Sequence, residues 1–326
     1  PISRRFNTRS IAIVALLLYI VSGTGCFGIK NLSALLFLRA FLGISVGLIM
    51  PLSTGLFAYY YPPEQQARLM GLSAAMNQMG GVVATLLAGL LATIAWNYAF
   101  LVYSMGLIAF VMVLLWLPAE KIGTENKRGK SFEPKQLLKF HPSVIGMLLL
   151  MSIFFVYPTN FAITASQGLG LNIQAITLIM VGLDVVAFFA GLVFGRLMQA
   201  ARKPMKYVAP IGFLLGYTLL LNTHSTATTL LGSLFIGIAN GIGVPYLLTI
   251  ASIKGGKNAA TTVMPLLSAA LYAGQFLSPI VVTPLSRYAF TVSDTVGTYK
   301  IAIVLCLCFL LQTLLTRKFH SLPPSQ

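Results

Sequence analysis

Long apolar stretches separated by short polar connections run along almost the whole chain. Apolar side chains follow one another continuously in these stretches instead of alternating with polar ones, which favours membrane-crossing helices of about 20 residues over a β-barrel. The pattern predicts an all-α polytopic membrane protein with ten spans, at about residues 11–28, 33–58, 68–94, 98–117, 143–166, 173–195, 206–222, 227–252, 261–285 and 299–316.

Composition supports this interpretation. Hydrophobic side chains make up 57% of the 326 residues and charged side chains only 9%, too few polar groups to cover a water-soluble globule of this size. We therefore expect the lipid bilayer to be the main partner of the protein.

The net charge of +16 would suggest nucleic acid as the partner of a soluble protein, but here the basic residues lie between the spans. Eighteen of them fall on one side of the predicted membrane, and the other side receives only Lys30, Arg287 and Lys300. This positive-inside bias predicts that both termini are cytoplasmic, and it leaves no nucleic-acid partner to expect. Compact loops and the lack of a targeting segment favour a bacterial inner membrane, and we expect a monomer.

Nothing in the sequence predicts an enzyme, a metal site or a cofactor. The three cysteines lie in or beside apolar spans and form no disulfide or zinc pattern. The three histidines lie in connections or in the tail, and no phosphate-binding P-loop occurs.

One apolar phrase occurs twice, as FLGISVGLIMP at 41–51 and FIGIANGIGVP at 235–245. Extending the offset of 194 residues matches the second predicted span with the eighth and the third with the ninth, in the same orientation, which indicates a parallel repeat of six helices. The first copy would lack its first two helices. We expect each copy to use its glycines for close packing and its proline for bending.

The only long polar stretch, 121–141, predicts a cytoplasmic loop between two bundles. The expected organisation is the remainder of an N-terminal bundle of four spans at 1–118, an inter-domain loop at 119–142, a C-terminal bundle of six helices at 143–318 and a cytoplasmic tail at 319–326.

Three motifs are similar to those of the major facilitator superfamily. LLFLRAFLGISVG at 35–47 resembles its fourth-helix motif, with Leu42 where glutamine is usual, and 71–92 resembles its exporter motif, with Thr85 in place of the proline. RRFNTR at 4–9 and GRLMQAARKP at 195–204 resemble its basic loops, without their acidic residue. The resemblance implies two six-helix bundles that open a central cavity to each side in turn, and it implies gating roles for Arg4, Arg5, Arg9, Gly195, Arg196, Arg202 and Lys203.

Asp184 is the only acid well inside a predicted span. A carboxylate there costs about 2.5–3.5 kcal/mol on insertion scales, which favours a protein-facing role in proton coupling or as counter-ion to a cationic substrate. A structural hydrogen bond between helices is the alternative. Arg39 is the only basic residue clearly within a span; it could snorkel to the surface, and the resemblance implies proton coupling or anion binding.

Polar and aromatic side chains gather where the family builds its cavity. As a group they suggest a sparsely charged, aromatic site for amphipathic or lipophilic molecules, although each alone could equally bond between helices. The residues are Asn77, Gln78, Tyr157, Thr159, Asn160, Asn240, Tyr246, Tyr272 and Gln275.

The predicted function is therefore secondary active transport of small organic molecules, with proton-coupled efflux of lipophilic or drug-like compounds as the leading form. Two alternatives stay open. One is an uptake permease for a small metabolite or organic anion, and the other is a truncated, non-transporting fragment.

Overall fold

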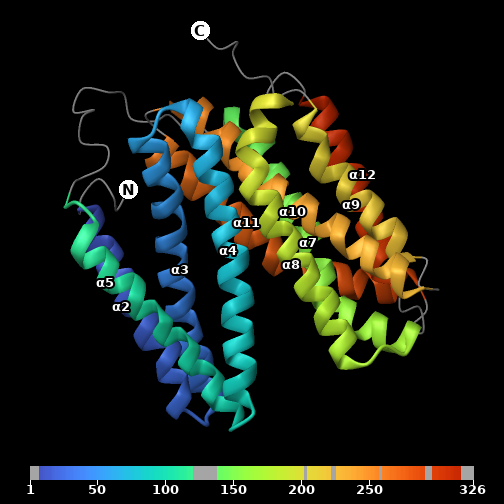
Figure 1. Ribbon diagram of the computed structural model, residues 1–326, viewed down its shortest axis with the longest axis horizontal. Helices are drawn as coiled ribbons and strands as arrows, with labels where there is room; N and C mark the ends of the chain where they lie inside the picture. The colour runs from blue at the N-terminus through green and yellow to red at the C-terminus, as the bar shows by residue number, and fades with distance from the viewer. Residues whose placement is uncertain are drawn as a thin grey trace. The chain divides into compact units, whose positions relative to one another are not determined.

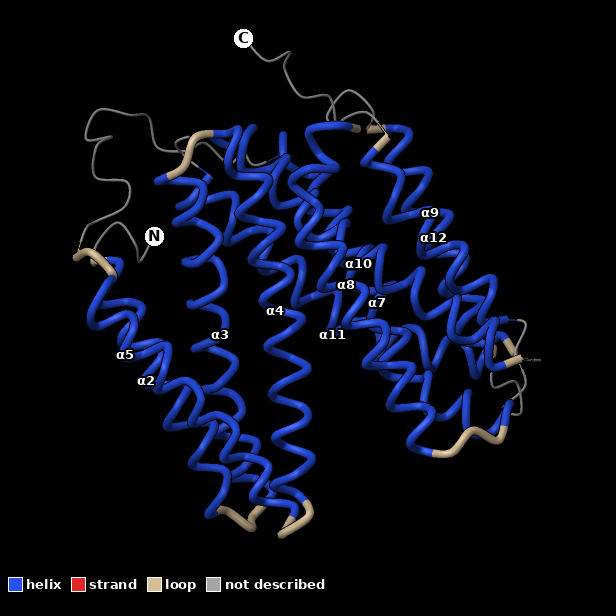
Figure 2. Tube along the Cα trace, viewed as in Figure 1, coloured by secondary structure: helices blue, strands red, loops and turns tan. Residues whose placement is uncertain are grey.

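The computed structural model describes residues 7–119, 138–201, 204–221, 225–256, 259–290 and 296–316. Within these ranges every regular element is helical, as Figure 2 shows. The α-helices are α2 (Thr8–Gly25), α3 (Leu32–Tyr60), α4 (Pro63–Ala92), α5 (Gly106–Trp116), α7 (His141–Leu169), α8 (Ile173–Ala200), α9 (Met205–Leu221), α10 (Thr226–Gly255), α11 (Met264–Ala289) and α12 (Gly297–Leu315) (Figure 1).

Four shorter helical turns connect or extend these helices. The longest is η2 (Trp96–Met105), which continues directly into α5. The others are η1 (Cys26–Gly28), η3 (Leu138–Phe140) and the π-helical η5 (Ala259–Val263), which leads into α11.

The predicted spans are confirmed as helices. Nine helical segments of the described chain are long and apolar enough to cross a membrane. The remaining predicted span, at 206–222, corresponds to α9, which is apolar but has only 17 residues. Large apolar side chains such as Leu115, Trp116 and Leu315 remain 70–78% exposed, as expected of an integral membrane protein whose outer surface faces lipid.

Local sequence explains where two of the helices begin and where one ends. Asn31 and Asn172 precede α3 and α8, and their side-chain oxygens accept hydrogen bonds from the backbone N–H groups of Ser33 and Ala175, both at 2.9 Å. These amides have no partner within the helix, so the caps fix both starts. Gly170 ends α7 with φ of +62°, a left-handed conformation that glycine adopts without strain.

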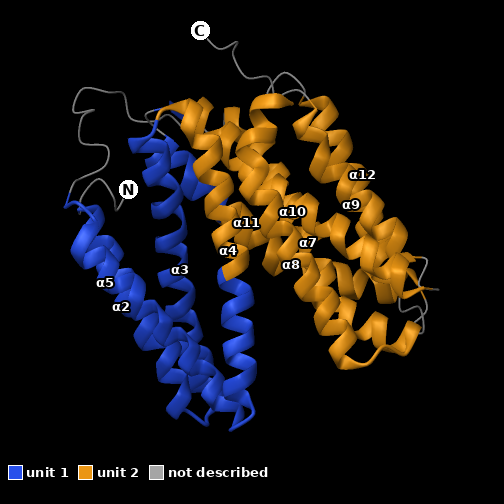
Figure 3. Cartoon of the chain, in the orientation of Figure 1, with its two compact units in different colours: residues 1–61, 80–132, 255–268 blue, residues 62–79, 133–254, 269–326 orange. Residues whose placement is uncertain are grey.

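The chain folds into two compact units (Figure 3). Unit 1 consists of residues 1–61, 80–132 and 255–268, and unit 2 of residues 62–79, 133–254 and 269–326. Helix α4 contributes its first part to unit 2 and the rest to unit 1. The inter-domain loop predicted at 119–142 lies largely outside the described residues, and the predicted domain boundaries stay a prediction.

In unit 1, α2 packs against α3, α5 and η2. Helix α3 also packs against η5, where a Cβ on Gly55 would lie 3.1 Å from the carbonyl oxygen of Ala260. This unit positions Arg39, which lies in the second turn of α3.

In unit 2, close contacts between helix backbones place α8 beside both α4 and α10. Gly237 of α10 faces Leu183 of α8, and Gly241 faces Ala187 one turn further on, so these two helices run parallel in a fixed register. Helix α11 is tied to α7 through Ser278, whose hydroxyl donates to the carbonyl of Ser152 at 2.8 Å. These contacts fix the helix that carries Asp184.

Candidate functional site

Asp184 lies in the middle of α8 and is half-buried. Glu64, the other acid among the described residues, lies in the first turn of α4 and is exposed. Asp184 is therefore the only carboxyl group at mid-helix depth in the described spans, at a position where burial without partners is costly.

The structure brings Asp184 together with a second predicted residue, Gln78. The Nε2 of Gln78 on α4 donates a hydrogen bond to Oδ1 of Asp184 at 3.2 Å. Both residues belong to unit 2, although 106 positions separate them in the sequence. A neutral amide does not cancel the negative charge of a deprotonated carboxyl group. Such a carboxylate can still take up a proton or bind a cation.

The predicted polar residues of α7 have different surroundings. Tyr157 is only 2% exposed, stacks on Phe161 with ring centroids 4.4 Å apart and donates from its hydroxyl to Ser233 Oγ of α10 at 2.8 Å. Thr159 donates to the carbonyl oxygen of Phe155 at 2.6 Å, and Asn160 donates to Thr159 Oγ1 at 2.8 Å. Tyr157 thus joins α7 to α10, whereas Thr159 and Asn160 bond within α7.

The predicted residues of α10 and α11 also lie in unit 2. Asn240 is 5% exposed, and its Oδ1 has no hydrogen-bond partner in the described part of the chain. Tyr246 is buried and Tyr272 half-buried. Gln275, also half-buried, directs its amide to the Met151 sulfur at 3.7 Å. Their role as a substrate cavity stays a prediction.

Asn77 precedes Gln78 on α4 and is exposed. Adjacent residues of a helix point about 100° apart, so the two amides face different surroundings. Its contribution to a cavity also stays a prediction.

Arg39 occupies an aromatic site in unit 1. Its guanidinium donates to the hydroxyl of Tyr103 at 2.6 Å, and its central carbon lies 4.9 Å from the ring centroid of Phe100 and 5.3 Å from that of Tyr103. Aromatic faces attract a cation electrostatically. No carboxylate lies in the described residues of unit 1, so these rings and the phenol oxygen stabilise the charge.

The structure describes three of the seven residues that are predicted to act in gating. Arg9 donates to the carbonyl of Leu114 at the end of α5, which ties the start of α2 to α5. Gly195 faces Arg68 of α4, where a Cβ would lie 2.8 Å from the Arg68 Cα, and Arg196 is exposed. Arg4, Arg5, Arg202 and Lys203 lie outside the described residues.

The two copies of the repeated phrase do not pack alike, which corrects one expectation. In the second copy Gly237 and Gly241 serve close packing, as predicted, and their neighbour is α8. In the first copy a Cβ on Gly43 or Gly47 would meet no heavy atom of the described chain within 4 Å. Glycine permits close packing but does not produce it, and no described helix lies beside α3 where α8 lies beside α10.

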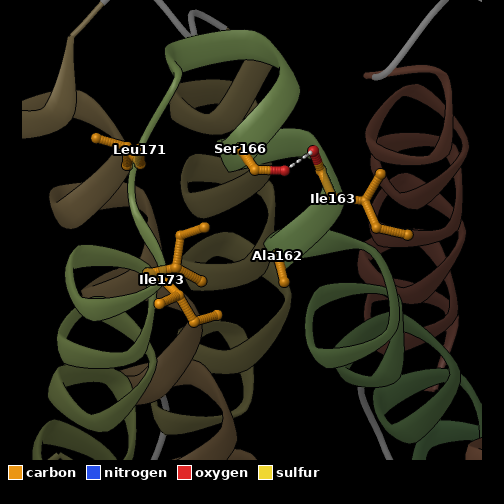
Figure 4. A pocket seen from close by; sticks show the side chains of 6 residues that line it. Ala162, Ile163, Ser166, Leu171 and Ile173 are labelled. Carbon is orange, nitrogen blue, oxygen red and sulfur yellow. Dashed lines mark hydrogen bonds between the residues drawn. The ribbon is translucent and has the colours of Figure 1, made fainter.

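A cavity of about 300 Å³ lies in unit 2 between the end of α7 and the start of α8 (Figure 4). Its only polar side chain is that of Ser166, which donates to the carbonyl oxygen of Ile163 at 3.1 Å. None of the predicted site residues lines it. Its lining consists of Ala162, Ile163, Ser166, Leu171, Ile173 and Ile176.

Several residues of these sites escaped the sequence analysis. Tyr103 and Phe100 next to Arg39, and Ser233 next to Tyr157, carry no signal in an apolar sequence, because their partners lie on other helices. A close contact of α8 with some other helix could have been expected. Gly191 and Gly195 form a G-x-x-x-G pair, and this spacing is typical of close helix contacts in membranes.

A set of apolar membrane-length helices, with one carboxyl group at mid-helix depth in the described spans, defines a polytopic membrane protein. The particular family follows from comparison with known proteins. The family model described as Major Facilitator Superfamily matches residues 1–279. The chain belongs to this superfamily.

Curated relatives share low identity with this chain. The quinolone resistance protein NorA of Staphylococcus aureus (strain MRSA252) is 25% identical over 219 residues, which cover 64% of this chain and 54% of NorA. A probable anion transporter 4, chloroplastic, of Arabidopsis thaliana is 33% identical over 91 residues, 28% of this chain and 17% of the relative. The chain thus spans about half the length of NorA.

Solved structures share the fold. The human organic anion transporter MFSD10 superposes with a TM-score of 0.77 at 16% identity, covering 94% of this chain and 77% of that one. The Escherichia coli fucose:proton symporter FucP gives 0.72 at 12% identity, with 99% and 86% covered. A double-tryptophan variant of XylE gives 0.76 at 16%, with 98% and 81% covered.

Proposed function

We propose that this protein exports lipophilic organic compounds in exchange for protons, by alternating access, with Asp184 as the proton-coupling group. The observation that carries the proposal is the half-buried Asp184 carboxyl at mid-helix depth, which accepts a hydrogen bond from the amide of Gln78. The likeness to NorA, a protein named for quinolone resistance, supports export of compounds of this kind.

Proton coupling in this proposal depends on the charge of the Asp184 side chain. A deprotonated carboxylate in a low-dielectric surrounding is costly, and protonation removes the charge. Since the neutral and charged forms favour different degrees of hydration, proton uptake biases the protein toward one of its two access states. A proton gradient then supplies the driving force.

The experiment compares the protein with Asp184→Asn in proteoliposomes under an imposed pH gradient. Norfloxacin, a fluorescent quinolone, and ethidium, a lipophilic cation, serve as probes. Asparagine keeps the shape of the side chain and its hydrogen-bonding capacity but cannot exchange a proton, so gradient-driven transport is lost while the melting temperature is kept. Equal transport by Asp184→Asn at every external pH would remove Asp184 from the mechanism.

Uptake of an organic anion is the second candidate function, and the surroundings of Arg39 favour it. The guanidinium is held by two rings and a phenol, and the described part of unit 1 offers it no carboxylate. A substrate carboxylate or phosphate could supply the missing negative charge. Protection of the purified protein against heat by organic anions, lost in Arg39→Gln, supports an organic anion as substrate; protection by lipophilic cations alone supports the substrate class of the first proposal.

We further propose that the protein works as a monomer in a bacterial plasma membrane with both termini in the cytoplasm. The positive-inside bias supports this orientation. Single cysteines introduced at exposed positions test it. A cysteine in place of Lys30 should react with an impermeant maleimide added to intact cells, whereas one in place of Arg196 should react only after permeabilisation.

A further inference from the structure

Helices α4 and α8 touch through their backbones. A Cβ on Gly71 would lie 2.6 Å from the carbonyl oxygen of Gly191, and a Cβ on Gly191 would lie 2.9 Å from the carbonyl oxygen of Gly71. One turn away, a Cβ on Gly195 would lie 2.8 Å from the Cα of Arg68. Real Cβ atoms are not found at such distances, so glycine is required there.

This contact determines which residues meet further along the two helices. Gln78 follows Gly71 by seven residues, and Asp184 precedes Gly191 by seven. Seven residues are about two turns, so each pair shares one face of its helix. Because Arg68 faces Gly195 while Gly71 faces Gly191, the helices run antiparallel. Gln78 and Asp184 therefore meet two turns from the glycine contact, at 3.2 Å.

The amide of Gln78 suits both protonation states of its partner. Its NH₂ group donates to an anionic carboxylate, and its carbonyl oxygen can accept from the hydroxyl of a protonated one. A hydrogen bond to the charged form is the stronger of the two. Gln78 thus restrains the rotamer of Asp184 in either state and stabilises the carboxylate more.

The charged groups on α4 and α10, two helices packed against α8, lie near the helix ends, and Tyr157 of α7 bonds elsewhere, so Gln78 is the hydrogen-bond donor to Asp184. Tyr157 of α7 lies within electrostatic range of Asp184 but donates its hydroxyl proton to Ser233. The charged residues of α4, Glu64 and Arg68, lie in its first two turns, and the only one of α10, Lys254, lies in its last turn. A neutral amide is the donor at the depth of Asp184.

We propose that Gln78 is a positioning residue for Asp184. The glycine contact between α4 and α8 holds Gln78 beside Asp184, and the hydrogen bond from Gln78 sets the pH at which Asp184 exchanges its proton. The inference deepens the proposed function and rests on it. Loss of the amide removes a donor that stabilises the carboxylate, so proton uptake then occurs at a higher pH.

The test is infrared spectroscopy of the purified protein in lipid, which needs no substrate. A carbonyl band that appears on acidification of the protein, but not of Asp184→Asn, is assigned to protonated Asp184. Gln78→Met keeps the length of the side chain and removes its hydrogen bonds. We expect the band to lie at a higher wavenumber in this variant and to appear about one pH unit higher. The pH profile of norfloxacin transport should move with it.

The matched control is Gln312→Ala, because the Gln312 amide donates to the carbonyl of Pro142 at 2.9 Å in the same unit. Its Asp184 band should be unchanged. An Asp184 band in Gln78→Met at the wild-type wavenumber and pH would overturn the positioning role alone. If Asp184→Asn removes no band at any pH, Asp184 does not take up a proton, and the proposed function fails first.

Discussion

Gly71 of α4 and Gly191 of α8 lie so close that neither position has room for a methyl group. Backbones approach this closely where at least one of the two helices presents glycine, because a side chain there would hold the backbones apart. In this protein the contact sets the register that brings Gln78 to Asp184.

Replacing Gly71 by alanine should therefore separate α4 from α8. We expect a loss of about 1–3 kcal/mol of unfolding free energy, the usual cost of forcing an extra methyl group into a packed contact. Transport should also fall in the protein that remains folded, because Asp184 loses its hydrogen bond from Gln78. Gly80→Ala on the same helix is the control, since its Cβ would meet no described atom within 4 Å. Unfolding in mixed detergent measures the stability, and transport in proteoliposomes measures the activity.

The repeated phrase offers a second matched pair. Gly237→Ala would place a Cβ 2.5 Å from the carbonyl oxygen of Leu183, whereas Gly43→Ala, at the corresponding position of the first copy, meets open space in the described chain. We expect Gly237→Ala to cost about 1–3 kcal/mol and Gly43→Ala to be neutral or slightly stabilising, as alanine favours helix over glycine by about 1 kcal/mol. Melting temperatures of the two variants decide the question, and equal losses would contradict the packing described for α8 and α10.

The aromatic site around Arg39 depends on Gly23. A Cβ there would lie 2.6 Å from the Cβ of Tyr103, so Gly23→Ala should displace the tyrosine that holds the guanidinium. Its effect should exceed that of Tyr103→Phe, because Tyr103→Phe removes only the hydrogen bond, whereas Gly23→Ala also moves the ring. Gly28→Ala has open space among the described residues and serves as control. The readout is transport and its dependence on Arg39; wild-type activity in Gly23→Ala would show that the site plays no part.

The Tyr157–Ser233 hydrogen bond should respond unequally to the loss of each partner. In Tyr157→Phe, Ser233 still donates to the carbonyl oxygen of Thr229 at 2.8 Å, so we expect a cost of about 0.5–1.5 kcal/mol. Ser233→Ala leaves the buried Tyr157 hydroxyl without its acceptor and should cost about 1–3 kcal/mol.

A double-mutant cycle provides the check on this pair. The double variant should lose less stability than the sum of the two single variants, because the unpaired hydroxyl is gone. Simple additivity would mean that the two side chains do not interact in the membrane.

Sequence by itself determined the helices of this protein, its membrane class, its family resemblance and the position of Asp184 inside a span. All of these depend on local properties, since a span is a run of apolar residues and a carboxyl group inside one is conspicuous wherever the helix packs. Gln78 could be named as a polar residue in a span, but its partner could not, because 106 residues separate it from Asp184 and no periodicity links α4 to α8.

Only the tertiary structure decided which polar and small residues have partners. Gly43 and Gly237 occupy the same place in a repeated phrase, yet one faces open space in the described chain and the other faces a backbone. Tyr157, Thr159 and Asn160 form one polar cluster in the sequence, yet only Tyr157 reaches another helix. The reason is geometric: a helix sequence fixes the order of side chains around its own axis, but the neighbour that each face meets depends on how the other helices pack.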